Sequence, residues 1–158
     1  MLLDHVRVHK LLPSLQSAYR AQHSTETAVL KVLSDILTAA DRGDLSMLTL
    51  LDLSAAFDTV DHPILLRRLM TSHGVNSGVH TWISSYLANR TQYVCCPGSR
   101  STPLPVLCGV PQGSVLGPML FLLYTADLVE SFELYPHLYA DDTQIYGYVV
   151  TQVDLSRK

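Results

Sequence analysis

The sequence predicts an α+β fold in which helices cover one face of an antiparallel sheet. The 158 residues are 47% hydrophobic and 16% charged, which is enough apolar material for one packed domain and excludes a disordered or fibrous chain. Helix-like and strand-like segments follow one another in a mixed order, without internal repeats or low-complexity tracts. A pair of β-prone segments surrounds Asp141 and Asp142 near the end of the sequence.

The first predicted elements are a helix and a strand. Ser24 or Thr25 can cap a helix that ends near Gly43. The apolar residues of this helix that follow a helical period are Val29, Leu33, Ile36, Leu37 and Ala40. The apolar run that follows predicts a strand over residues 46–53, which contains Asp52 close to its end.

Two helices are expected next. Asp61 can cap a helix that carries Pro63 in its first turn and runs to about residue 72. A second amphipathic segment covers residues 79–89. The first half of the chain therefore reads helix, strand, helix, helix.

The second half predicts strands around one further helix. Residues 91–107 are typical of a hairpin with its turn at Pro97 and Gly98. Residues 109–117 form a loop, and the apolar run over 115–129 is long enough for a helix with Pro118 in its first turn. The pair of strands around Asp141 completes the pattern.

Charge and cysteine content limit the possible partners and compartment. The net charge of −3 counts against polynucleotide binding by the isolated chain, because proteins that neutralise phosphates are ordinarily basic. The three cysteines show no CxxC pair or zinc spacing, and their odd number does not indicate a disulfide framework. The start of the chain is unlike a secretory signal, and the longest apolar stretch, residues 119–126, is too short to span a bilayer. We expect an intracellular protein, cytoplasmic or nuclear or both.

Three carboxylates form the first candidate site. Asp52 closes an apolar strand, and Asp141 and Asp142 lie between two others. Folding that brought them together would make a hard oxygen site suited to Mg²⁺, and two shared divalent ions can activate a hydroxyl and steady a leaving oxygen in phosphoryl chemistry. The structural alternative is a polar hairpin turn for Asp141 and Asp142 and a helix cap for Asp52.

A glycine-rich loop and an aromatic residue are further candidates. Gly109, Gly113 and Gly117 allow the backbone to approach a flat ligand, and Gln112 offers both a donor and an acceptor to a nucleotide. The loop matches no dinucleotide or P-loop pattern, so a structural turn is its alternative. Phe57, five positions after Asp52, could press on a nucleotide sugar and refuse a 2′-hydroxyl, whereas its alternative is a place in the core.

The order of these segments resembles a known family. Residues 51–62, 109–118 and 139–143 resemble motifs A, B and C of the reverse transcriptases of non-LTR (LINE-type) retrotransposons. Residues 16–20 and 24–28 extend the resemblance upstream, where they look like the segment that joins fingers to palm. The resemblance covers nearly the whole chain.

The resemblance implies RNA-templated DNA synthesis with two Mg²⁺ ions, for which Mn²⁺ could substitute. Its implied partners in a full-length enzyme are an RNA template, a DNA primer and a deoxynucleoside triphosphate, with no membrane. The resemblance implies that Asp52 and Asp141 are catalytic metal ligands, with Asp142 as their support and the Leu53 carbonyl as a further ligand. It also implies that Phe57 is the sugar gate, that Gln112 and Gly113 lie in the pocket for the nascent base pair, and that Tyr139 lies near the primer end.

The resemblance also implies a fold and its limits. It implies a polymerase palm, a ferredoxin-like antiparallel sheet with helices on one face, within one partial domain over residues 1–158. Residues 1–45 would join fingers to palm, residues 46–150 would be the palm, and residues 151–158 a truncated tail. With fingers incomplete and thumb absent, we expect the isolated fragment to be inactive and to self-associate through exposed apolar surface.

A catalytically inactive remnant, acting at most as a folding or protein-interaction module, is the alternative function. Primer extension on an RNA template, compared with an Asp141→Asn variant, distinguishes the two.

Overall fold

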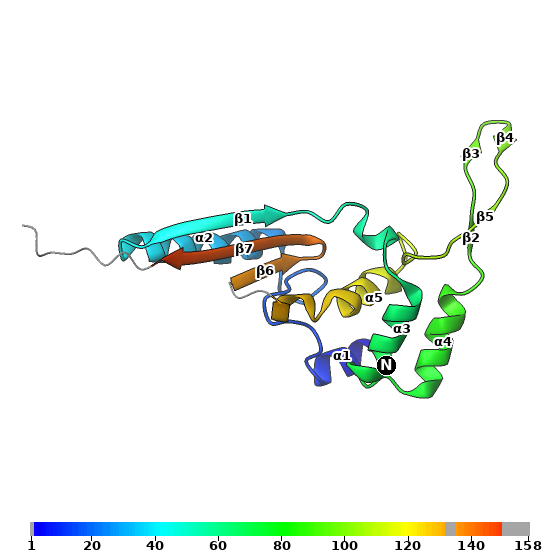
Figure 1. Cartoon of the computed structure of the whole chain (residues 1–158), viewed down its shortest axis with the longest axis horizontal. Coiled ribbons are helices and arrows are strands. Elements are labelled where there is room, and N and C mark those ends of the chain that lie inside the picture. Colours follow the sequence, from blue (N-terminus) through cyan, green and yellow to red (C-terminus); the bar gives the residue numbers. More distant parts are fainter. Residues whose placement is uncertain (1, 132–134, 150–158) are drawn as a thin grey trace, which may run out of the picture. The chain divides into compact units, whose positions relative to one another are not determined.

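Figure 1 shows the computed structural model of the chain, which describes residues 2–131 and 135–149. The chain divides into two compact units. Unit 1 comprises Met1–Leu12 and Ser54–Ala126, and unit 2 comprises Pro13–Leu53 and Asp127–Lys158. The mixed α+β class that the sequence predicts is confirmed, whereas the predicted tail over residues 151–158 lies outside the described residues.

Unit 2 contains an antiparallel sheet of three strands in the order β1-β7-β6. The strands are β1 (Leu45–Leu51), β6 (Tyr135–Tyr139) and β7 (Asp142–Val149). The register of β1 and β7 runs from the Leu45–Val149 pair to the Leu51–Thr143 pair. Strand β1 therefore ends one residue before Asp52, two residues earlier than the sequence predicts.

Helix α2 (Thr25–Asp41) packs against this sheet (Figure 1). A capping box starts it as predicted, because the Ser24 hydroxyl accepts from the Thr27 amide and the Thr27 hydroxyl accepts from the Ser24 amide. The Tyr146 hydroxyl of β7 donates to Asp35 at 2.6 Å and ties the sheet to the helix.

The face of α2 that packs against the sheet differs from the apolar stripe in the sequence. The buried residues are Ala28, Val32 and Ala39. The larger apolar side chains of the predicted stripe are exposed: Val29 by 49%, Leu33 by 47% and Leu37 by 55%. Small side chains face the sheet, so the apolar residues that mark the helical period are mostly not the ones that pack against it.

Unit 1 is built from helices around one apolar core. Its elements are α1 (Leu2–Val8), a single 3₁₀ turn η1 (Ala56–Asp58), α3 (His62–Thr71), α4 (Ser77–Leu87) and α5 (Leu116–Thr125). The fully buried side chains are Val60, Leu65, Leu69, Ile83, Leu87, Leu120, Phe121, Leu122 and Leu123. Nearly every apolar residue of α5 is buried, which explains why its sequence shows no polar face.

Local signals set the ends of these helices. The Asp61 carboxylate accepts from the Ile64 amide at 2.8 Å, and Pro63 lies in the first turn of α3, as predicted. Asn76 caps α4 in the same way, and the helix begins at Ser77, two residues before the predicted start. Helix α5 ends at Thr125, short of the predicted residue 129, and a 3₁₀ segment η2 (Leu128–Ser131) follows.

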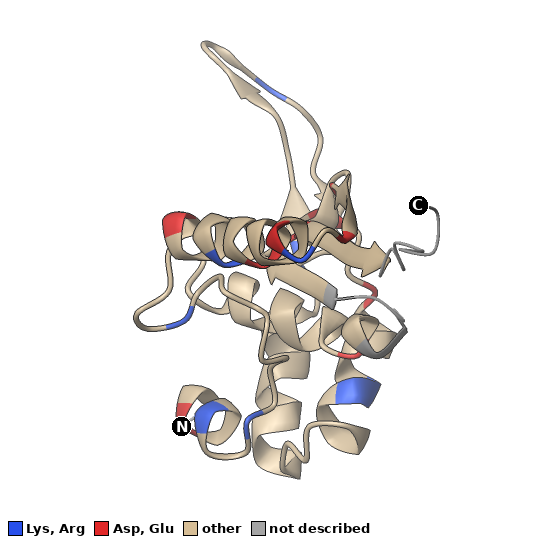
Figure 2. Cartoon of the chain, turned by 90° about the vertical axis from the view of Figure 1, so that its left-hand side faces the viewer, with Lys and Arg blue, Asp and Glu red and all other residues tan. Residues whose placement is uncertain are grey.

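A long hairpin extends away from the helices of unit 1 (Figure 1). Its paired segments are β2 (Thr91–Gln92) with β5 (Leu104–Pro105), and β3 (Cys95–Cys96) with β4 (Ser99–Arg100). We call residues 91–105 the hairpin arm. The predicted hairpin is confirmed, and Figure 2 shows that the arm bears positive but no negative charge.

All three cysteines are free and exposed, as the odd count and spacing indicated. Among the helices of residues 2–131, none combines the length and the apolar character that crossing a membrane requires.

Candidate active site

The β6–β7 hairpin of unit 2 carries two of the predicted carboxylates. Tyr139 pairs with Asp142, so Ala140 and Asp141 form a two-residue turn between the strands. Ala140 has a φ of +58°, in the left-handed region that residues with a Cβ rarely adopt. The half-buried Tyr139 ends β6, and its predicted place near the primer end stays a prediction.

Asp52 leaves the neighbouring strand at the same end of the sheet. The last pair of β1 and β7 is Leu51 with Thr143, so Asp52 follows one member of this pair and Asp142 precedes the other. In Figure 1 the end of β1 and the β6–β7 turn lie at the same end of the sheet. The register thus brings together the backbone positions of the three predicted carboxylates, which the sequence separates by some ninety residues.

These carboxylates are open to solvent. Asp52 and Asp142 are exposed and Asp141 is half-buried, and Leu53, the predicted carbonyl ligand, is exposed beside Asp52. Acidic oxygens are the donors that Mg²⁺ prefers, and Mg²⁺ takes only one or two protein carboxylates and completes its shell with water and phosphate. The donor chemistry therefore fits Mg²⁺.

The side chains do not form a preassembled set. Within residues 2–131 and 135–149, no three His, Cys, Asp or Glu side chains lie together in an arrangement that could hold a metal ion. The register therefore sets the positions of the three carboxylates, and their common role in metal binding stays a prediction.

The remaining predicted residues belong to unit 1, where the segment after Asp52 meets the glycine-rich loop. The Gly109 amide donates to the Val60 carbonyl at 2.7 Å, and the Val110 amide donates to the Phe57 carbonyl at 2.8 Å. Asp61 and Cys108 form an isolated antiparallel bridge. We call this contact between residues 57–62 and 108–112 the Gly109 joint.

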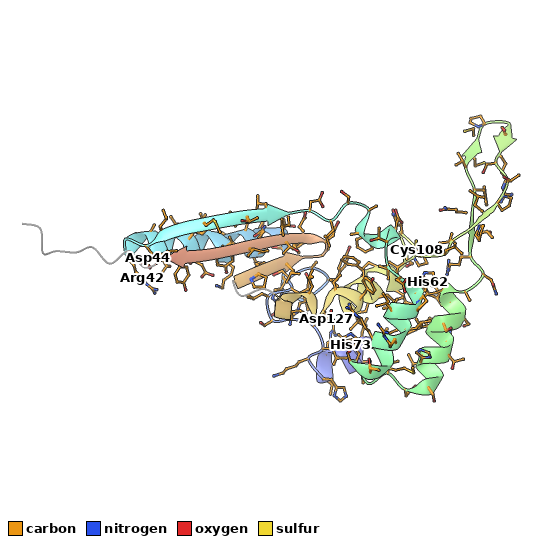
Figure 3. All side chains as sticks on the ribbon, viewed as in Figure 1. Arg42, Asp44, His62, His73, Cys108 and Asp127 are labelled. Carbon is orange, nitrogen blue, oxygen red and sulfur yellow. The ribbon has the colours of Figure 1, made fainter. Side chains whose placement is uncertain are left out.

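Gly109 is required at this joint. A Cβ at Gly109 would lie 2.9 Å from both the Cα and the carbonyl oxygen of Asp58, and its φ is +89°. The sequence predicted that glycine here lets the backbone approach a flat ligand, whereas the close neighbour of Gly109 in the structure is the backbone of Asp58. His62 closes the joint through its Nε2, which lies 2.7 Å from the Gly109 carbonyl (Figure 3 labels His62 and Cys108).

Gln112 and Gly113 lie at the exposed edge of the joint. The Gln112 amide donates to the Asp58 carboxylate at 2.9 Å. Beside them is an open cleft of about 380 Å³, which is lined among others by Asp58, Arg90, Gln92, Gly109, Pro111 and Gln112. The cleft has both polar and apolar lining, and the predicted contact of Gln112 and Gly113 with a nucleotide stays a prediction.

Phe57 is half-buried and stacks on Phe121 of α5, with ring centroids 4.6 Å apart and planes at 27°. The alternative of a core phenylalanine thus accounts for one side of the ring. The predicted role as sugar gate is not tested by this contact.

Sequence reasoning missed the partners of several of these residues. The Asp58–Gln112 hydrogen bond and the contact of His62 with Gly109 join residues about fifty positions apart, so no local pattern could reveal them. Gln16 was noted only as part of the resemblance, yet its side chain bonds the backbone of Ala140 at the hairpin tip.

The structure thus has an antiparallel sheet with acidic residues at a hairpin tip and directly after the end of the adjacent strand. The sequence profile of the family described as "Reverse transcriptase (RNA-dependent DNA polymerase)" matches residues 1–152. The chain belongs to this family, and the predicted resemblance is confirmed.

Three relatives with curated descriptions come from mobile elements of Drosophila melanogaster. The chain is 33% identical over 155 residues to the RNA-directed DNA polymerase from mobile element jockey of Drosophila melanogaster, covering 91% of this chain and 16% of that protein. It is 35% identical over 127 residues to the probable RNA-directed DNA polymerase from transposon BS of the same species, covering 80% of this chain and 14% of that protein. It is 36% identical over 118 residues to the probable RNA-directed DNA polymerase from transposon X-element, covering 75% and 13%. The chain thus spans about one sixth of the length of the first of these relatives.

Proposed function

We propose that this chain forms the nucleotidyl-transfer centre of an RNA-directed DNA polymerase of a non-LTR retrotransposon. In this proposal Asp52 and Asp141 hold two divalent cations, Asp142 supports them, and the Leu53 carbonyl adds a ligand. The observation that carries the proposal is the β1–β7 register, which puts the backbones of Asp52 and Asp142 at the same end of the sheet, directly beyond the Leu51–Thr143 pair.

Magnesium ions bound there would supply activation of a primer 3′-hydroxyl and neutralisation of the charge that develops on the leaving phosphate. The chain's own part is to present carboxylates from backbone positions that the sheet fixes. Two strands of one sheet hold the backbone on both sides of the carboxylates. The exposure of Asp52 and Asp142 leaves their oxygens accessible to a triphosphate.

The palm assignment belongs to the same proposal. A three-stranded antiparallel sheet with α2 on one face supports it, since the acidic residues lie at one end of that sheet. The template, primer and deoxynucleotide are proposed as partners because the fly relatives are named as RNA-directed DNA polymerases. Because the net charge of −3 opposes binding of these polyanions, we propose that other parts of a longer polymerase bind them.

Metal binding tests the carboxylates directly. We expect Mn²⁺, followed by electron paramagnetic resonance, to bind the 158-residue chain, and either Asp52→Asn or Asp141→Asn to weaken binding about tenfold or more, because each removes a shared anionic ligand. Asp44→Asn is the matched control, because Asp44 precedes the opposite end of β1 (labelled in Figure 3) and should leave the affinity unchanged. Equal affinity in all three variants would contradict the metal assignment.

Primer extension on an RNA template tests the reaction. We expect little synthesis by the chain alone, because positioning of the reactants contributes much of the acceleration of bond formation. In a jockey polymerase that carries this chain in place of its matching segment, synthesis should occur, and Asp52→Asn should abolish it without unfolding the protein. Undiminished synthesis by the Asp52→Asn form would contradict the proposal. Absence of synthesis by the chimeric polymerase, with Asp141 present or replaced, would favour an inactive remnant.

Phe57 is proposed as the sugar gate, because it follows Asp52 by five residues and stays half-buried although it stacks on Phe121. In the same chimeric polymerase, Phe57→Val should increase incorporation of ribonucleotides relative to deoxynucleotides. Phe121→Leu is the control for loss of the stack alone, and an equal loss of discrimination in both variants would assign Phe57 to the core.

A further inference from the structure

The segment Pro13–Arg20, which we call the Gln16 loop, runs beside β6 in unit 2. The Leu138 amide donates to the Leu15 carbonyl at 2.9 Å, and the Ser17 amide donates to the Leu138 carbonyl at 2.8 Å. These two bonds flank Gln16 and form a parallel bridge between Gln16 and Leu138. The backbone of Gln16 is therefore fixed two residues before the hairpin tip.

The side chain of Gln16 binds the tip itself. Its Oε1 accepts from the Ala140 amide at 3.1 Å, and its Nε2 donates to the Ala140 carbonyl at 3.4 Å. One amide side chain thus satisfies both backbone polar groups of the residue whose φ is +58°. Gln16 is only 2% exposed, so water does not compete for these bonds.

The Gln16 loop is itself held in place. Arg20 donates from one guanidinium nitrogen to the carbonyls of Pro13, Ser14 and Gln16, at 3.0, 3.1 and 2.9 Å. The Gln16 Oε1 also accepts from the Ala18 amide at 3.0 Å, and the Ser17 hydroxyl lies 2.9 Å from His137 Nε2. Hydrogen bonds therefore hold the loop that carries the Gln16 side chain.

We infer that Gln16 is a positioning residue that fixes the hairpin tip, so that Asp141 and Asp142 are presented in one orientation to a cation. The inference rests on the proposed function, and it goes beyond that proposal by giving a role to a residue some 120 positions from the acidic pair. A turn with a residue in the left-handed region has alternative backbone conformations, and a carboxylate on such a turn can rotate away from its ligand position. Two hydrogen bonds to the Ala140 peptide groups remove that freedom.

The test compares Gln16→Met, which keeps the length of the side chain but forms none of these hydrogen bonds, with Ser17→Ala. Ser17 is a matched control because it is buried in the same loop and bonds β6 through His137, away from the tip. In the full 158-residue chain, Gln16→Met should speed hydrogen exchange of the Ala140 amide about fivefold or more, as loss of one hydrogen bond implies. It should also weaken Mn²⁺ binding about tenfold, as loss of a residue that orients a ligand does. Ser17→Ala should leave the Mn²⁺ affinity within about twofold.

A conservative variant keeps the inference falsifiable if Gln16→Met fails to fold. Gln16→Glu retains the acceptor for the Ala140 amide, so exchange at Ala140 should stay slow while the donor to the Ala140 carbonyl is lost. Fast exchange in this variant, or unchanged exchange and Mn²⁺ affinity in Gln16→Met, would overturn the inference.

The Asp141→Asn variant separates the two proposals. If Mn²⁺ binding is insensitive to Asp141→Asn, the metal assignment fails, whereas exchange at Ala140 still decides whether Gln16 holds the tip. If Mn²⁺ binding depends on Asp141 but not on Gln16, the positioning role alone fails.

Discussion

At Gly109 the backbones of two motifs come so close that a side chain larger than hydrogen does not fit. Its replacement by alanine places a Cβ 2.9 Å from the Asp58 backbone and forces a residue with a side chain to a φ of +89°. We expect Gly109→Ala to lower the free energy of unfolding, measured by urea denaturation, by roughly 2–5 kcal/mol from backbone strain and overpacking together.

Gly98→Ala is the matched control for Gly109→Ala. Gly98 has a φ of +77°, but nothing lies within 4 Å of the Cβ that alanine would add. It should lose only the backbone contribution of about 1–2 kcal/mol. Equal losses in the two variants would show that the Gly109 joint does not require the close approach.

His137 makes the stability of unit 2 depend on pH. Burial lowers the pKa of His137, the positive charge of Lys31 lowers it further, His23 acts in the same direction, and Asp35 opposes them. The side chain is 4% exposed, and its Nδ1 has no hydrogen-bond partner in the described part of the chain. The folded protein therefore holds this imidazole in its neutral form at a pH where the unfolded chain binds a proton.

The sign of the pH effect follows from this difference in bound protons. The contribution of His137 to stability is fully present above the ordinary pKa of 6.5 and is lost as pH falls from there toward the lowered pKa of the folded state. Urea denaturation at about pH 7.5 and about pH 5.5 should show lower stability at the acidic pH, and His137→Gln should reduce this difference. His9→Gln, at an exposed position in unit 1, is the control, and an unchanged pH difference in His137→Gln would contradict the assignment.

At the scale of elements, α2 offers a test of which helix face carries the energy. Val32 is 5% exposed, whereas Leu33, which belongs to the stripe that the sequence favoured, is 47% exposed. We expect Val32→Ala to lower the free energy of unfolding by roughly 1–3 kcal/mol, since it removes buried methyl groups. Leu33→Ala removes a larger side chain but should cost less than about 0.5 kcal/mol. The reverse order would indicate that the face of α2 that carries Leu33 packs against the sheet.

The same helix shows what the sequence can and cannot predict. The start of α2 at Ser24 and that of α3 at Asp61 follow from side chains that bond their own backbone three residues on, so a local pattern identifies them. The buried face of α2 depends on the sheet that it meets, and that sheet joins β1 to strands almost a hundred residues later. Local periodicity contains no information about this partner.

The candidate site divides in the same way. Asp52 and Asp141 could be predicted to approach each other because each stands at the end of a strand, and the register supports this prediction. The bonds of Gln16 to Ala140 and of Gln112 to Asp58 could not be predicted, because a glutamine in a loop has no characteristic spacing. The resemblance drew attention to both glutamines without giving their partners.

At the scale of the whole molecule, the exposed apolar surface of β1 predicts self-association. Leu45, Met47 and Leu50 are 68%, 60% and 69% exposed, and β1 lies at an edge of its sheet. An apolar edge strand invites pairing with another chain. Sedimentation velocity should therefore show a sedimentation coefficient that rises with protein concentration.

A charge on the edge strand should reverse this behaviour. Met47→Lys should shift the chain toward the monomer, as lysine on an edge strand opposes pairing. Leu107→Lys adds the same charge at another exposed apolar position, outside β1, and should change the association little. A monomer at every concentration of the unaltered chain would contradict the prediction.

The Gly109 joint brings together the two ends of a long segment of unit 1. His62 and Gly109 lie 47 positions apart in the sequence yet are in contact. The segment that contains α3, α4 and the hairpin arm is therefore a long loop that this contact closes. The entropy of closing such a loop grows only slowly with its length. Residues at the tip of the arm can therefore be inserted, deleted or substituted while the contact between Asp58 and Gln112 at its base is kept. The arm is thus a place where related elements can diverge without loss of the residues at its base.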